Sequence, residues 1–157
     1  MKATTADAQA ALDKFSAEGV KVADISGSAA NATIAATANV KDVFYFSDKL
    51  AATAATPDFK IGSFGAGDSI VLGSGYTYNS GALSTGDNNK AEFFFVKGDA
   101  GLQLVIETAN YGSSDIAAAN PTTGAIGNNA GDHAQVITLI GVTAEHVSVA
   151  NGVVSYV

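Results

Sequence analysis

One stretch decides the fold of this chain: Ala91-Glu92-Phe93-Phe94-Phe95-Val96-Lys97, then Gly98-Asp99-Ala100-Gly101, then Leu102-Gln103-Leu104-Val105-Ile106-Glu107-Thr108. Leucine or isoleucine at every second position of the last part gives the period of a strand that buries one face. The three phenylalanines supply aromatic area to both faces of the first part. The small, Gly-containing segment between the two parts favours a tight turn. The stretch therefore predicts a hairpin formed by residues 91–97 and 102–108.

Strand-sized apolar segments continue on both sides of this hairpin. Asn151-Gly152 is a favourable two-residue hairpin turn, because both residue types tolerate positive φ. Near the start of the chain, Thr4 or Thr5 can cap a helix that ends at about Glu18, before Gly19. The other predicted strands are Val20–Ile25, Ala32–Thr37, Asp42–Phe46, Phe59–Phe64, Ser69–Leu72, Ala134–Ile140, Val147–Ala150 and Val153–Val157.

These segments predict an all-β fold: a mainly antiparallel β-sandwich or β-roll-like domain with one short N-terminal helix. They recur roughly every 8 to 12 residues between turn signals, which is typical of such folds. A chain of 157 residues fits a single β-rich domain over residues 1–157, with helix in 1–19 and strands in 20–157. The polar segments Gly73–Asn89 and Asn110–Asp132 are expected to run over the surface.

Composition excludes several classes of partner and site. The formal net charge is −7 and all eight basic residues are lysines, so the guanidinium groups that read phosphates and bases are absent and we expect no nucleic-acid partner. No apolar run approaches the roughly 20 residues of a membrane-spanning helix, so no membrane span is expected. The chain has no cysteine, which excludes disulfides and thiolate metal sites. The N-terminal residues lack the apolar core of a secretory signal peptide, so either the protein is cytosolic or its export signal lies elsewhere.

Candidate catalytic residues are few, and each has a structural interpretation. His133 and His146 have no third imidazole to complete a zinc site. Glu92, Glu107 and Asp115 offer carboxylates that could pair as in glycosidases, but nothing in the sequence fixes their separation. We therefore predict a protein that is not an enzyme, with no catalytic residue, and rank a secreted hydrolase last among the functions considered.

Tyr76, Tyr78 and Tyr111 lie in segments rich in Gly, Asn and Ser. Their rings could stack on sugars while neighbouring amides bind the hydroxyl groups, which would make a carbohydrate-binding site. The alternative is that these tyrosines cap the ends of a β-sandwich.

Acidic and amide side chains gather in predicted turns, and they suggest calcium as a cofactor. The candidate ligands are Asp68, Asp87, Asn88, Asp99 and Asp132. Calcium prefers such oxygen ligands, whereas zinc requires nitrogen or sulfur atoms that are scarce here. The alternative is that these residues only form Asx-turns, since Asp and Asn are standard turn formers.

Two segments carry a resemblance to a known family. Asp42-Val43-Phe44-Tyr45-Phe46 is followed by Ile61-Gly62-Ser63-Phe64-Gly65-Ala66-Gly67-Asp68-Ser69-Ile70-Val71-Leu72. This resembles a D-x-F-x-F strand followed by I-x-x-F-x-x-G-D-x-I-x-L in the C-terminal region of large type I-secreted, RTX-type bacterial adhesins and S-layer proteins. The resemblance covers residues 42–157. The calcium-binding nonapeptide Gly-Gly-x-Gly-x-Asp is missing, so a calcium β-roll is not implied.

The resemblance implies a non-enzymatic structural or adhesive module of a secreted bacterial cell-surface protein. Such a module would lie outside the cell, and it would self-assemble or anchor as a homo-oligomer or surface lattice. Export information would then lie in the C-terminal strands, including Val153–Val157. The alternative function is the carbohydrate-binding module described above, with a glycan as partner.

Overall fold

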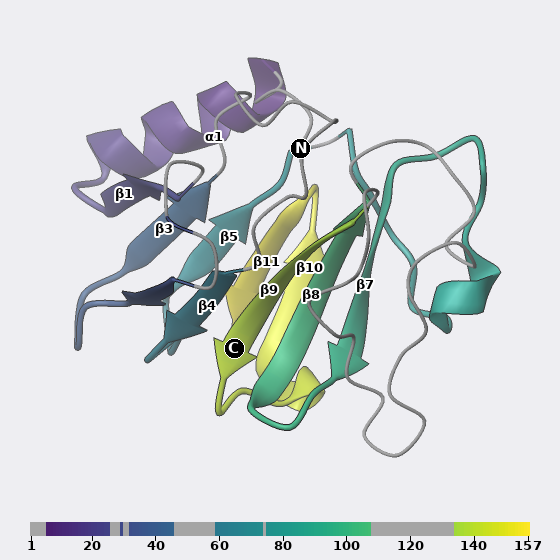
Figure 1. Ribbon diagram of the computed structural model, residues 1–157. Helices are drawn as coiled ribbons and strands as arrows, with labels where there is room; N and C mark the ends of the chain where they lie inside the picture. The colour runs from purple at the N-terminus through teal and green to yellow at the C-terminus, as the bar shows by residue number, and fades with distance from the viewer. Residues whose placement is uncertain (1–5, 26–28, 30–31, 46–58, 74, 108–133) are drawn as a thin grey trace.

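The structure is a computed structural model that describes residues 6–25, 29, 32–45, 59–73, 75–107 and 134–157 (Figure 1). It contains one α-helix and two β-sheets, so the protein is mainly β, as predicted. The elements are α1 (Ala6–Ala17), β1 (Lys21–Asp24), β2 (Thr33–Ala35), β3 (Asp42–Tyr45), β4 (Phe59–Gly62), β5 (Ser69–Val71), β6 (Thr77–Tyr78), η1 (Leu83–Thr85), β7 (Glu92–Lys97), β8 (Gly101–Glu107), β9 (Ala134–Ile140), η4 (Ala144–His146), β10 (Val147–Ala150) and β11 (Val153–Tyr156). Within these ranges no helix has the length and hydropathy needed to cross a membrane.

Each predicted strand segment contains an observed strand, although β8 begins one residue earlier than expected. The predicted hairpin is confirmed, with Phe93 opposite Ile106 and Phe95 opposite Leu104. The excursion Gly73–Asn89 also contains β6 and the 3₁₀ turn η1, which the sequence did not predict. The predicted loop Asn110–Asp132 lies outside the described residues.

The five-stranded sheet has the order β1-β3-β5-β11-β10. Strands β1, β3 and β5 run parallel to one another, whereas β11 is antiparallel to both β5 and β10. The six-stranded sheet has the order β2-β4-β9-β8-β7-β6. Here β2, β4 and β9 are parallel, β8 is antiparallel to β9 and β7, and β6 is parallel to β7.

The expectation of a mainly antiparallel fold is therefore wrong, because both sheets are mixed. The reason lies in the path of the chain from β1 to β5. Each successive strand in this part enters the opposite sheet, so neighbours within one sheet are separated by a strand of the other. Two strands separated by such a crossover can run in the same direction, whereas a tight hairpin turn always reverses the chain.

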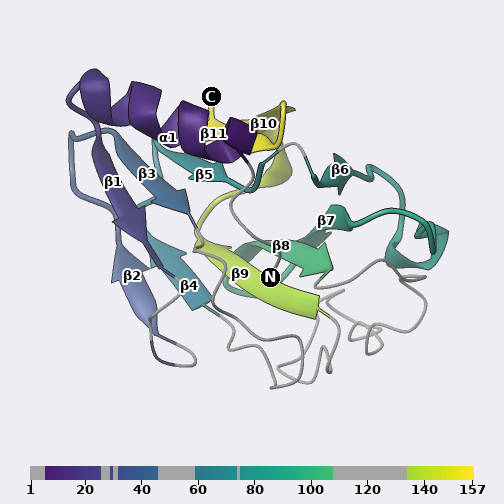
Figure 2. The same ribbon diagram turned by 90° about the horizontal axis from the view of Figure 1, so that it is seen from above.

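The two sheets share one hydrophobic core, and α1 lies on the outer face of the five-stranded sheet (Figure 2). Leu12 of the helix is buried with Val43 and Val71, which face away from the second sheet. The side chains buried in the shared core include Phe44, Ile70 and Val154 from one sheet and Phe59, Ile61, Phe93, Leu104, Ile106, Ile137 and Leu139 from the other. This arrangement leaves the ends and edges of the sheets as the places where side chains can meet a ligand.

Candidate functional site

Asp68 of the predicted calcium set has a structural role. Its Oδ1 accepts a hydrogen bond from the backbone N–H of Asp42 at 2.9 Å, and its Oδ2 accepts one from the N–H of Gly65 at 2.9 Å. Asp42 is also buried and accepts hydrogen bonds from the backbone N–H and the hydroxyl of Thr37. Asp68 therefore ties the turn before β5 to the first residue of β3.

The other predicted calcium ligands lie in exposed turns or outside the described residues. Asp87 accepts hydrogen bonds from the backbone N–H and side chain of Asn89 and pairs with Lys90 at 3.1 Å. The backbone hydrogen bond from Asn89 contributes most to lowering the pKa of Asp87, and Lys90 adds to it. Asn88 is exposed, as is Asp99 at the tip of the β7–β8 hairpin.

Asp132 lies outside the described residues, and so does His133. In the part of the chain that the structure describes, no three His, Cys, Asp or Glu side chains are arranged to hold a metal ion. The structure does not bring the candidate ligands together, and calcium binding stays a prediction.

The three candidate tyrosines have different environments. Tyr76 is only 7% exposed and belongs to the shared core. Tyr78 is 39% exposed, and its ring centroid lies 5.3 Å from that of Phe93 and 5.2 Å from that of Phe95. Tyr111 lies outside the described residues. Of the described pair, only Tyr78 presents a ring surface that a ligand could reach.

Glu92 and Glu107 lie at adjacent strand ends and are closed to solvent. Glu107 Oε2 accepts a hydrogen bond from the backbone N–H of Glu92 at 2.7 Å, and Glu92 accepts one from the side chain of Asn79 and one from the N–H of Asp87. Burial raises the pKa of Glu107 to about 7, and the neighbouring negative charge of Glu92 adds to this. The pair anchors the segment before β7, and its burial does not suit an acid that must reach a substrate. Asp115, the third carboxylate considered from sequence, lies outside the described residues.

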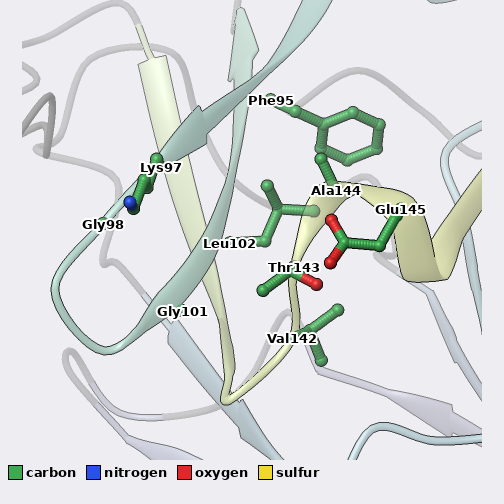
Figure 3. Close-up of a pocket in the computed structure, with 9 residues that line it drawn as sticks. All are labelled: Phe95, Lys97, Gly98, Gly101, Leu102, Val142, Thr143, Ala144 and Glu145. Atoms are coloured by element: carbon green, nitrogen blue, oxygen red, sulfur yellow. The ribbon is translucent and has the colours of Figure 1, made fainter.

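A pocket of about 320 Å³ opens where the chain crosses from β9 to β10 (Figure 3). Its lining is mostly apolar, with one cationic and one anionic side chain: Phe95, Lys97, Gly98, Gly101, Leu102, Val142, Thr143, Ala144 and Glu145. In the view of Figure 3, Lys97 and Glu145 stand on opposite sides of Leu102. A hydrogen bond from Thr143 lowers the pKa of Glu145, which keeps that carboxylate ionised.

Strand β10 follows the pocket-lining residues in the sequence, and it is the edge strand of the five-stranded sheet. The backbone O of His146 accepts a hydrogen bond from the N–H of Val157 at 2.9 Å. In the β10–β11 register, this bond means that Ser148 and Ala150 direct their backbone groups toward β11. In an antiparallel pair, every second residue directs its N–H and C=O away from the partner strand. By this alternation Val149 directs its N–H and C=O outward, where the described part of the chain supplies no further strand. Val147 offers only its C=O there, because its N–H donates to the backbone O of Ala144.

The sequence did not predict the pocket or single out the edge. The pocket combines a hairpin end with a crossover some forty residues later in the chain, and no local pattern links them. The edge strand was predicted, but its place at the end of a sheet follows only from the strand order.

No protein-family model, no curated protein and no solved structure matches this chain.

Proposed function

We propose that this β-sandwich domain is a non-enzymatic structural or adhesive module of a secreted bacterial cell-surface protein, and that it self-assembles or anchors through the edge strand β10. The observation that carries the proposal is the composition of that edge. β10 reads Val-Ser-Val-Ala, without charge or proline. Proteins usually protect an exposed edge with charges, prolines, bulges or very short strands, because an open ladder pairs with other chains.

The opposite end of the same sheet is protected in the usual way. β1 carries Lys21 and Asp24 at its two ends, both exposed. At the ends of the six-stranded sheet, β6 has only two residues and β2 only three. Of these four strands, β10 is the best suited to accept another strand.

The residues that carry the family resemblance also support the proposal, because the two matching segments contact each other in the structure. Asp42 and Asp68, the acidic residues of its two segments, are linked by a hydrogen bond. Phe44 and Phe64, an aromatic residue from each segment, have ring centroids 6.5 Å apart in the core. The two segments are thus in contact in the fold, and an extracellular module is the function that the resemblance implies.

Self-association measured by sedimentation velocity over a wide concentration range tests this proposal. We expect the wild-type protein to form larger species as its concentration rises. Ser148→Lys places a charge on β10 at an exposed position and should weaken association about tenfold or more. Ser80→Lys adds the same charge at an exposed loop position and should behave as the wild type. A wild-type protein that remains monomeric at every concentration would contradict self-assembly.

A second candidate function, carbohydrate binding, is favoured by one observation. Tyr78 rests on Phe93 and Phe95 with much of its ring exposed, and Phe95 also lines the pocket. Stacking against a sugar requires such a rigid, accessible aromatic face. Binding on a glycan array that is lost in Tyr78→Ala, but kept in a Val40→Ala control at another exposed apolar position, would support it. An array without any bound glycan would reject it.

A further inference from the structure

The five-stranded sheet leaves part of the facing sheet uncovered beyond β10. In both views β7 lies farther toward one side of the molecule than β10 does (Figures 1 and 2). The core-facing side chains there are accessible: Tyr78 is exposed, and Phe95 is only partly buried although it packs against the core. Phe93, which Tyr78 contacts, is fully buried. The shared core therefore ends in partly exposed aromatic side chains on the side of the molecule beyond β10.

The pocket lies at this same place. Its apolar walls come from Phe95, Leu102 and Val142, which pack with the shared core, and from Ala144 of the turn that leads into β10. A side chain that enters the pocket would thus touch residues of both the six-stranded sheet and the crossover. The first open backbone group of the edge, the C=O of Val147, follows only three residues after Ala144.

We propose that an extended segment of another polypeptide chain adds to β10 as a sixth strand and inserts one apolar side chain into this pocket. The inference rests on the proposed function, since it names the partner that β10 accepts. Main-chain hydrogen bonds to the C=O of Val147 and to the N–H and C=O of Val149 provide affinity, and a pocket for an alternate side chain provides specificity, which is the usual division in strand addition. The inward side chains of the added strand would cover Tyr78 and Phe95.

The chemistry of the site selects the character of this segment. β10 has no charge to pair with, and the pocket interior is apolar. Lys97 and Glu145 contribute opposite charges to the pocket lining, so the site has no excess charge that would attract a charged segment. The partner is therefore an uncharged segment with apolar side chains at alternate positions. A free sugar or small molecule could fill the pocket, but it would not use the outward ladder of β10.

A synthetic peptide tests the inference independently of self-association. The probe is a fluorescent, capped peptide of alternating threonine and valine with a central leucine, titrated against the full chain by anisotropy. We expect saturable binding. A control peptide in which proline replaces every residue except the central leucine lacks the ladder N–H groups in either strand direction and should bind at least tenfold more weakly.

Two variants of the protein separate the edge from the pocket. Ala144→Trp fills the pocket from an exposed position, and Ser148→Lys charges the edge. Each should weaken peptide binding about tenfold, while Ser80→Lys should not, and thermal melting verifies that all three are folded. Absent binding, equal binding of the proline peptide, or binding unchanged by Ala144→Trp would overturn strand addition with pocket insertion. If one of these results is found but the wild type still self-associates, only the inference fails and the proposed function stands. If the peptide binds but the wild type stays monomeric, only self-assembly is rejected and strand addition stands.

Discussion

The two halves of the chain build the same two sheets by different routes. Between β1 and β5 successive strands alternate between the sheets, and neighbours within each sheet are parallel. From β7 onward the chain turns back on itself, so that β7, β8 and β9 are antiparallel neighbours in sequence order, as are β10 and β11. Tight turns connect β7 to β8 and β10 to β11, whereas the neighbouring strands of the first half come from segments farther apart in the sequence.

The largest expected effect comes from breaking one of those distant contacts in the first half. Asp68→Ala leaves the buried backbone N–H of Asp42 and the partly buried N–H of Gly65 without their acceptor. Each such loss costs about 1–3 kcal/mol, so we expect a loss of about 2–5 kcal/mol in the free energy of unfolding. Urea denaturation measures it. Asp99→Ala at the exposed hairpin tip is the matched control and should change stability by less than about 0.5 kcal/mol. Equal effects of the two variants would contradict the difference between the halves.

The next effect tests the point where the halves meet. Gly152 has φ of +72°, and a Cβ there would lie 2.1 Å from the backbone O of Gly73. Gly141 has nearly the same φ, +74°, but open space around it. Gly152→Ala should therefore cost about 1–3 kcal/mol more than Gly141→Ala, which reports backbone strain alone. Thermal melting compares them. If both variants melt together, the hairpin turn is not packed against the first half.

A smaller effect concerns the base of the central hairpin, in the second half. The pKa of Glu107 is raised to about 7 from an ordinary value of 4.5. Since the folded state holds the proton more tightly than the unfolded state, this contribution is complete below pH 4.5 and is lost as the pH rises toward 7. Glu107→Gln mimics the protonated acid and removes the dependence. We expect the variant to match the wild type at pH 4.5 and to exceed it by about 1–2 kcal/mol at pH 8. A difference between the two proteins that does not change with pH would refute this assignment.

The smallest effect is that of calcium, which we expect to bind at the exposed turns on either side of β7. Asp68 already accepts two backbone hydrogen bonds, so Asp87 and Asp99 are the accessible candidates. Millimolar calcium should raise the melting temperature by about 2–4 °C, which corresponds to about 1 kcal/mol for a chain of this size. Asp87→Asn should reduce the shift. Superimposed melting curves with calcium and with chelator would show that these turns are only turns.

The same contrast explains how far the sequence predicts the structure. Alternation placed the strands, and turn residues joined 91–97 to 102–108, because those signals act between near neighbours. The sequence carries no such local signal for the parallel pairings of β1 with β3 and of β3 with β5, because a strand of the other sheet separates the partners in each pair. Tyr76 and Tyr78 are two residues apart and similar in sequence context, yet only strand order decides that one is buried and the other exposed.

The candidate site was unpredictable for the same reason. Phe95 and Leu102 were recognised as hairpin residues, but the crossover residues Val142 and Ala144 meet them only in three dimensions. The strand Val147–Ala150 was placed correctly, but its position at the end of a sheet depends on where β5 and β11 pair.

Backbone amide exchange along β10, measured by NMR as a function of protein concentration, tests the central claim most directly. Ser148 and Ala150 donate within the β10–β11 ladder, so their amides should be protected at every concentration. The N–H of Val147 already donates to the backbone O of Ala144, so the informative amide is that of Val149. It points outward and should gain protection as the protein associates, with Ser148→Lys suppressing that gain. Association that leaves the amide of Val149 exchanging as fast as in the monomer would contradict assembly through β10.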